Sequence, residues 1–150
     1  MRIHTDFKMR KNLVILAAIL LTACASPPRT YSFSNTKTYE KTYDEVWEDL
    51  IGFFASRNIQ IKNIAKDSGV VYAETTQFNE SMADCGDPGL FQVMSKRVNF
   101  NVFVTRSGPN PKVTVNATYS ETRRFDRNVV TVSCNSKGTL ERIILTQVGR

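Results

Sequence analysis

The feature that most limits how this chain folds is a short apolar run near its start, Leu13–Leu21. Basic residues precede the run and small residues follow it, which is the pattern of a secretory signal peptide. The basic residues are Arg2, Lys8, Arg10 and Lys11. The run is too short to cross a bilayer as a helix, which needs about 20 apolar residues. We therefore expect residues 1–23 to be removed, which leaves 127 of the 150 residues for a single domain and a tether.

The end of this run, Leu21-Thr22-Ala23-Cys24, resembles the lipobox of bacterial lipoproteins. The resemblance implies that Cys24 receives a diacylglycerol on its sulfur, and that its new amine is acylated after cleavage. Several acyl chains on one residue are enough for stable anchoring. Ala25 follows where an aspartate would imply retention in the inner membrane, so we expect the outer membrane, facing the periplasm. The alternative is an ordinary signal with a chance cysteine, and both Met1 and Met9 are candidate start sites.

The composition of the remaining chain limits its chemistry. Residues 1–23 hold four of the 20 basic and one of the 14 acidic residues, so the remainder carries a formal charge of +3. This gives little support for a nucleic-acid partner, and we expect none. The only histidine, His4, lies in the signal, which excludes histidine-based triads and cysteine–histidine pairs. We expect no catalytic residue, no metal and no cofactor beyond the lipid on Cys24. A carboxylate pair such as Glu74 and Glu121 is the remaining enzymatic alternative.

The clearest helix in the sequence begins after Thr42. Thr42 and Glu45 have the spacing of a capping box. At 100° per residue the apolar side chains fall on one side of the helix. They are Tyr43, Val46, Trp47, Leu50, Ile51, Phe53 and Phe54. We interpret this aromatic stripe as core. The alternative is a ligand-binding cleft between this helix and the sheet, lined by Trp47, Phe53, Phe54 and Phe100.

Alternating apolar and polar residues predict the strands, and a long hairpin around residues 107–111 is the clearest of them. Residues 75–89 read as a long loop, and residues 123–127 break the alternation. Ser136 is a candidate cap for a last helix. The expected strands cover residues 31–34, 59–62, 70–73, 96–106, 113–119 and 129–132. This order predicts an α+β domain at residues 31–150, with an antiparallel sheet and two helices packed on one face, preceded by the tether at residues 24–30.

Three short motifs add a family resemblance. Thr42-Tyr43-Asp44-Glu45-Val46-Trp47 opens a helix, Asp67-Ser68-Gly69-Val70-Val71 forms a turn and strand, and Gly138-Thr139-Leu140-Glu141 follows Cys134. These segments look like small bacterial envelope lipoproteins with a domain similar to the helix-grip domain of BamC, the lipoprotein subunit of the β-barrel assembly machinery. The resemblance covers roughly residues 30–148 and implies one helix-grip-like domain.

Two cysteines remain after Cys24, namely Cys85 and Cys134. The bacterial envelope is oxidising, so we expect a disulfide between them. Closing a loop of this length stabilises the fold by roughly 4 kcal/mol in the loop-entropy model. Free thiols are the first alternative. A zinc site is the second, although two cysteines without histidine are a poor ligand set. The acids near Cys85, which are Glu80, Asp84 and Asp87, do not have the spacing of an EF-hand calcium loop.

Arg123, Arg124 and Arg127 surround Phe125 and form a candidate partner surface. Lipid headgroups, peptidoglycan carboxylates or an envelope protein are the partners that fit the expected location, and the alternative is a solvated edge. We therefore expect a non-catalytic, lipid-anchored envelope protein that acts as an interaction or accessory module. The second hypothesis is a binding module for a small hydrophobic ligand or lipid. The sequence leaves the identity of the partner and the oligomeric state undetermined.

Overall fold

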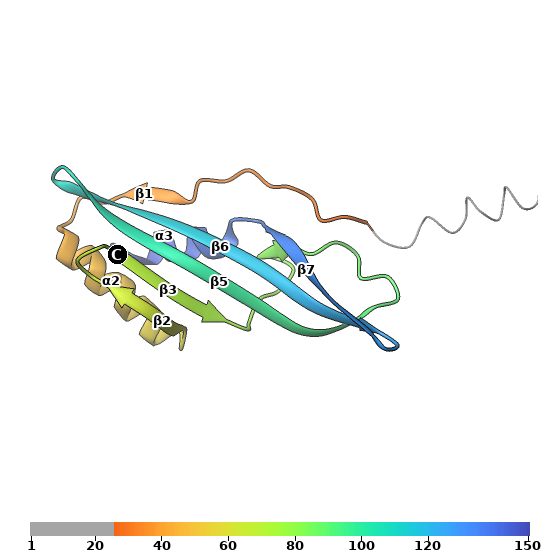
Figure 1. Ribbon diagram of the computed structural model, residues 1–150. Coiled ribbons are helices and arrows are strands. Elements are labelled where there is room, and N and C mark those ends of the chain that lie inside the picture. The colour runs from red at the N-terminus through yellow and green to blue at the C-terminus, as the bar shows by residue number, and fades with distance from the viewer. Residues whose placement is uncertain (1–25) are drawn as a thin grey trace, which may run out of the picture.

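The computed structural model describes residues 26–150 (Figure 1). The predictions for residues 1–25, including the signal peptide, the modification of Cys24 and the sorting role of Ala25, lie outside the described residues. The elements are β1 (Thr36–Thr38), α2 (Tyr43–Ser56), β2 (Gln60–Ala65), β3 (Val70–Thr75), β4 (Ala83–Asp84), β5 (Gln92–Ser107), β6 (Asn110–Phe125), β7 (Asn128–Ser136) and α3 (Thr139–Gln147). Neither of these helices is long and apolar enough to cross a membrane.

All strand pairs are antiparallel, and the strands form one sheet in the order β2-β3-β5-β6-β7-β4, with β1 paired to β6. The predicted hairpin is confirmed and is longer than its alternation indicates, because β5 and β6 have 16 residues each. These two strands run the length of the domain (Figure 1). Gly69 has a φ of 67° in the turn before β3, and its carbonyl accepts a hydrogen bond from Val104 N–H at 2.7 Å, which ties this turn to β5.

The prediction of an α+β domain with two helices packed on one face of the sheet is wrong, and with it the helix-grip-like arrangement. The domain is mostly a seven-stranded antiparallel sheet with only two short helices. The lengths explain the difference. A 16-residue strand spans about 53 Å, whereas the 14-residue α2 spans about 21 Å and the 9-residue α3 about 14 Å. Helices of this size cannot cover such a sheet as a layer.

The strands also differ from their predicted positions. β6 continues through Arg123 to Phe125, where the sequence predicts a break, and β7 extends from Asn128 to Ser136. The segment at residues 31–34 is not a strand, and β1 lies a few residues later. The long loop contains the short strand β4, which pairs with the end of β7. The last helix has Gly138 as its N-cap, while Ser136 Oγ accepts a hydrogen bond from Gly138 N–H.

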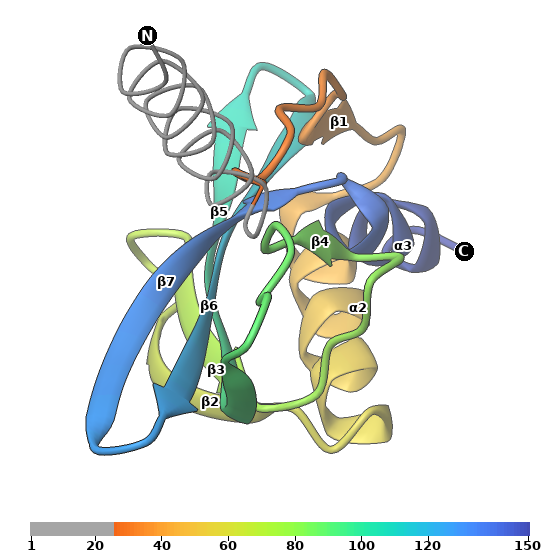
Figure 2. The same ribbon diagram turned by 90° about the vertical axis from the view of Figure 1, so that its right-hand side faces the viewer.

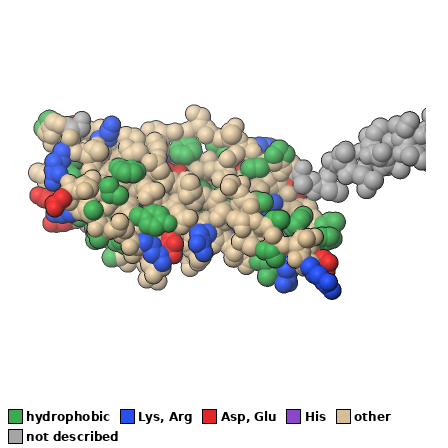
Figure 3. Space-filling model, viewed as in Figure 1, with side chains coloured by type: hydrophobic (Ala, Val, Ile, Leu, Met, Phe, Trp, Pro, Cys, Tyr) green, Lys and Arg blue, Asp and Glu red, His purple; other side chains and the backbone are tan. Residues whose placement is uncertain are grey.

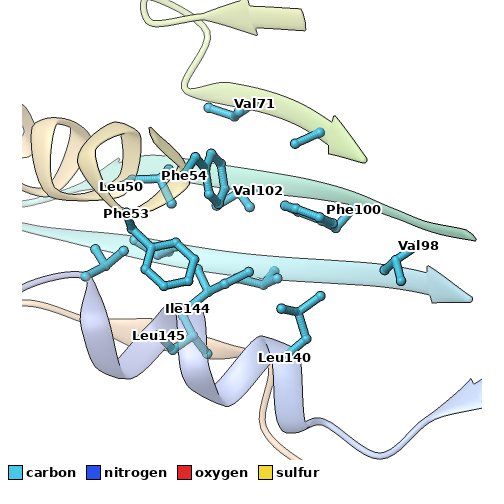
Figure 4. Close-up of a cluster of buried hydrophobic side chains, with 14 of the residues drawn as sticks. Leu50, Phe53, Phe54, Val71, Val98, Phe100, Val102, Leu140, Ile144 and Leu145 are labelled. Carbon is cyan, nitrogen blue, oxygen red and sulfur yellow. The ribbon is translucent and has the colours of Figure 1, made fainter. Parts of the chain in front are cut away.

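The interpretation of the α2 stripe as core is confirmed. The capping box is present: Glu45 N–H donates to Thr42 Oγ1 at 3.3 Å, and Thr42 N–H donates to Glu45 Oε2 at 2.8 Å. The core joins this helix to the middle of the sheet and to α3 (Figure 4). The ring centroids of Phe54 and Phe100 lie 5.5 Å apart in an edge-on arrangement. Val46, Trp47, Leu50, Phe53 and Phe54 are all buried. This core covers only the middle of β5 and β6.

Candidate functional site

The disulfide between Cys85 and Cys134 is present, as predicted from the cysteine count. It links the loop after β4 to the end of β7, two elements that are 49 residues apart in the chain. The bond therefore fixes one end of the segment at residues 86–91, which joins β4 to β5. Without it this segment would rest only on polar contacts, which are described next.

Beside the disulfide lies a buried ion pair. The Arg123 guanidinium donates to Glu121 Oε2 from Nε at 3.1 Å and from Nη2 at 3.0 Å. The same Nη2 donates to the backbone carbonyls of Cys85 at 2.7 Å and Gly86 at 3.2 Å. Lys96 Nζ lies 3.5 Å from the other Glu121 oxygen, Oε1. Arg123 is only 6% exposed, so its charge is satisfied inside the domain. It holds the loop after β4 onto the sheet.

The beginning of the described chain is docked against the same loop, although residues 24–30 are predicted to be a solvated tether. Asp87 N–H donates to the Ser26 carbonyl at 3.2 Å. Asp84 accepts from Arg29 N–H at 3.2 Å and from the Tyr31 hydroxyl at 2.9 Å. The Gly86 N–H, followed by the Tyr31 hydroxyl, lowers the pKa of Asp84. From the other side, Asn135 donates its side-chain amide to the Arg29 carbonyl at 3.1 Å.

Gly86 is the residue that lets this docking occur. It has a φ of 69°, a left-handed conformation that glycine adopts without strain. A Cβ atom at this position would lie 2.3 Å from the Ser26 carbonyl oxygen and 3.1 Å from Pro28 N. Any side chain here would therefore push residues 26–28 away from the loop.

An apolar surface lies at the end of the sheet next to this docked segment. The β6–β7 turn projects at the right-hand end of Figure 1 and curves away from α2 and α3 in Figure 2. Hydrophobic side chains gather at this end in the space-filling view, beside basic ones (Figure 3). We name it the distal surface, and its apolar members with their exposed fractions are Leu90 (76%), Val129 (61%), Met94 (49%), Phe125 (46%) and Val130 (40%).

The backbone explains why these side chains are exposed. Phe125 and Asn128 form the last pair of the β6–β7 hairpin, and Val129 and Val130 follow directly along β7. The register of β5 shifts between Val93 and Ser95, and this bulge leaves Met94 without a partner on β6. Bulges commonly redirect a side chain in this way. Leu90 lies on the segment that the disulfide and Arg123 hold in place.

The three arginines predicted as a partner surface have two different positions. Arg123 faces inward and forms the ion pair described above, so it offers nothing to a partner. Arg124 and Arg127 are exposed, on β6 and in the β6–β7 turn respectively. They lie on the distal surface next to Phe125 and Val129, and Asp126 is the one acid in the turn between them. The exposed surface around these arginines is therefore smaller and more apolar than the sequence indicates.

The other candidate site residues are occupied within the fold. Trp47, Phe53, Phe54 and Phe100 are buried in the core instead of lining an open cleft, and the Phe54 ring packs edge-on against those of Phe53 and Phe100. Glu74 lies next to the core residue Ala73 and points to the opposite face of the sheet from Glu121, so the two carboxylates do not meet. Within residues 26–150, no group of three or more potential metal-ligating side chains occurs.

A hollow of about 260 Å³ lies on the sheet face opposite the core, close to the distal surface. Hydroxyl groups and one guanidinium line it, from Ser95, Arg97, Ser120, Thr122 and Thr131. Thr122 and Thr131 are paired across β6 and β7, three pairs away from the Phe125–Asn128 pair. On this face, the hydroxyl-bearing side chains thus begin about 10 Å from the tip of the hairpin, and the pair nearer the tip is Arg124 and Val129.

Comparison with known proteins adds no assignment. No protein-family model matches the chain, and no curated protein matches it either.

The apolar part of the distal surface has only a weak signature in the sequence. Arg123 and Arg124 interrupt the alternation, which predicts that the strand ends before Phe125. The sequence signal for this apolar surface is Asp126-Arg127, if these residues are read as a two-residue hairpin turn. Phe125 and Val129 then flank a turn at the end of a long hairpin, beyond the reach of any core. Leu90 and Met94 reach the same place only through the disulfide and the bulge.

Proposed function

We propose that this chain is a lipid-anchored, non-catalytic envelope protein, held by Cys24 at the periplasmic face of the outer membrane, that acts as an interaction module through its distal surface. The observation that carries the proposal is the gathering of five exposed apolar side chains at one end of the domain. Large exposed apolar surfaces usually mark contacts with proteins or membranes, because water solvates them poorly. An envelope protein is the partner expected from the sequence.

Two further observations support this use of the distal surface. The segment carrying Leu90 is fixed by a disulfide and by Arg123, so the surface is ordered before any contact forms. Preorganised surfaces lose less conformational entropy on binding. The lipobox-like Leu21-Thr22-Ala23-Cys24 supports the anchor, and the absence of histidine after His4 supports a non-catalytic role.

Site-specific photocrosslinking in intact envelopes tests the proposal. A photoreactive amino acid is placed in the full chain at Leu90 or Val129, with Glu48 and Ser56 on the outer side of α2 as matched controls. We expect adducts from the first two positions and few from the controls. Adducts confined to the α2 positions would show that contacts are made elsewhere.

The anchor is tested separately by metabolic labelling with palmitate. Cys24→Ala should abolish labelling and move the protein out of the membrane fraction. Normal labelling of this variant would disprove the lipobox interpretation. Fractionation of the unaltered protein with the inner membrane would disprove the sorting inference drawn from Ala25.

A further inference from the structure

We propose that the distal surface is a second membrane contact: the β6–β7 hairpin and the segment at residues 86–91 dip into the lipid monolayer that holds the acyl chains of Cys24. This inference rests on the proposed function and names the occupant of its interaction surface. Four observations lead to a lipid surface rather than to a protein.

The first observation is the short distance to the anchor. Cys24 precedes Ser26 by two residues, which reach at most about 7 Å. Ser26 is hydrogen-bonded to Asp87, three residues before Leu90. A lipid on Cys24 therefore brings this loop close to the membrane. Figure 1 shows the described chain beginning at the same end as the β6–β7 turn.

The second observation is the shape of the surface. The apolar side chains lie on a projecting hairpin and loop, and they occupy both of its faces. Val129 and Val130 are neighbours on β7, so they point to opposite sides of the sheet. Both are exposed. A fluid monolayer surrounds a projecting tip on all sides, whereas one protein surface contacts one face of it.

The third observation is charge. Arg124 and Arg127 flank the apolar tip, and the turn between them holds a single acid, Asp126. The tip of the β6–β7 hairpin, residues 124–129, therefore carries a net charge of +1. The carboxylates of Asp84 and Asp87 belong to the loop after β4, where they accept hydrogen bonds from the N–H groups of Gly86 and Gly89. Basic residues at a membrane surface favour binding to anionic lipids, by about 1 kcal/mol each.

The fourth observation is depth. Amphipathic segments at an interface bury their apolar side about 5–10 Å into the boundary between headgroups and acyl chains. On the sheet face opposite the core, the hairpin bears Val129 and Arg124 near its tip and hydroxyl groups at Thr122 and Thr131. That change lies about 10 Å from the tip. Arg97 in the adjoining hollow then lies at or above the level of the headgroup phosphates.

Tryptophan quenching by brominated lipid tests the inference. The full-length lipoprotein is purified from envelopes and reconstituted into vesicles of phosphatidylethanolamine and phosphatidylglycerol, with or without bromine on the acyl chains. The variants are Leu90→Trp and Phe125→Trp. The matched control is Thr118→Trp, an exposed site on β6 about 23 Å from Phe125. Native Trp47 is buried in the core and gives the background emission.

We expect bromine to quench the added emission at positions 90 and 125, together with a blue shift, and to leave position 118 unquenched. Adding Arg124→Glu and Arg127→Glu should reduce quenching at position 125 in vesicles containing phosphatidylglycerol, and should have less effect when that lipid is absent. This pair of results would establish both insertion and its dependence on charge.

Other outcomes overturn the inference and locate the error. Quenching at position 118 equal to that at position 125 would show that the whole sheet lies flat on the membrane. No quenching at any position, with Val129 photocrosslinked to a protein, would replace the membrane with a protein partner and leave the proposed function intact. No quenching and no crosslinks from the distal surface would remove the proposed function as well.

Discussion

Strands β5 and β6 pass through two regions whose interiors have opposite chemistry. In the middle of the domain, Val98, Phe100 and Val115 are fully buried with side chains of α2 and α3. At the distal end, the inward side chains of β6 are the charged residues Glu121 and Arg123, while apolar side chains face solvent. The distal end is held by a disulfide, ion pairs and hydrogen bonds instead of by a hydrophobic core.

This difference shows how one sheet serves two purposes. Apolar side chains in the middle supply the free energy that keeps the protein folded. The distal end takes its rigidity from covalent and polar contacts, so its apolar side chains remain available for binding. If stability were the only requirement, an apolar residue would be expected at the buried position of Arg123 and a polar one at the exposed position of Phe125. The following predictions test this division, from the largest expected effect to the smallest.

The largest effect is expected in the apolar core. Trp47→Ala should lower the free energy of unfolding by roughly 3–5 kcal/mol, because the indole is buried and leaves a cavity. Glu48→Ala, on the exposed side of α2, should change it by less than about 0.5 kcal/mol. Urea unfolding measures both values. Equal costs would mean that α2 packs in a different orientation.

Removing the disulfide should lower the free energy of unfolding by a comparable amount. Replacing Cys85 and Cys134 together by serine should destabilise the domain by roughly 4 kcal/mol in the loop-entropy model. Chemical reduction of the unaltered protein should give a similar loss. Hydrogen exchange should accelerate most in the segment at residues 86–91, since this bond fixes it. Unchanged exchange there would show that the polar contacts alone hold the distal end.

The next largest effect on stability is expected at the buried ion pair between Arg123 and Glu121. Arg123→Met leaves Glu121 with Lys96 as its remaining cation and releases the carbonyls of Cys85 and Gly86. We expect a loss of about 3 kcal/mol, measured by thermal unfolding, because breaking a buried ion pair leaves a charge that is poorly compensated. Arg124→Met is the matched control and should have an effect below about 0.5 kcal/mol. Adding Glu121→Gln to Arg123→Met should recover part of the loss, and failure to do so would argue against the buried charge as the cause.

A smaller, pH-dependent effect is expected at Glu141. This carboxyl is 1% exposed and accepts from Ser136 Oγ at 2.7 Å, while its Oε2 atom has no partner in the described structure. Burial raises its pKa above the usual value. Protonation therefore favours the folded state, and this contribution to stability is lost as the pH rises through the folded-state pKa. Glu141→Gln should flatten that dependence in melting curves recorded from pH 4 to pH 8, which is about the range where carboxyls with raised pKa values titrate. If the slope of melting temperature against pH is unchanged in this variant, the pH dependence belongs to another group.

The smallest effect on stability should accompany a large effect on binding. Leu90→Ser with Val129→Ser removes exposed apolar side chains, so the melting temperature should change little. Distal contacts in intact envelopes, measured by a photocrosslinker at Phe125, should be lost. Ile64→Ser, at an exposed apolar position on β2, is the control and should leave them unchanged. Retained crosslinks in the double variant would show that Arg124 and Arg127 are sufficient for the distal contacts without these apolar side chains.

Local patterns in the sequence predict those parts of the fold that depend on neighbouring residues. Thr42 and Glu45 are three residues apart, so the capping box is visible in the sequence and present in the structure. The long hairpin follows from alternation for the same reason. The disulfide is predictable because only two cysteines remain after Cys24.

Features that depend on distant residues are not predictable in this way. Arg123 looks like the end of a strand, because a charge at a core position is unusual. Its partners Glu121 and Cys85 become its neighbours only after the sheet and the loop have assembled. The distal surface is hidden from sequence patterns for the same reason, since it combines Leu90, Met94 and Val129 from three segments.

The contacts of the distal end also set when it forms. The β5–β6 hairpin closes through a tight turn, so it needs only local encounters. By contrast, Asp84 binds Arg29 across 55 residues, and Asn135 binds the Arg29 carbonyl across 106. Long loops close slowly because more chain entropy is lost before any contact is gained. The segment around Arg29 is therefore expected to dock last during folding, so residues 26–31 are held against the distal end only once the hairpins of the sheet are complete.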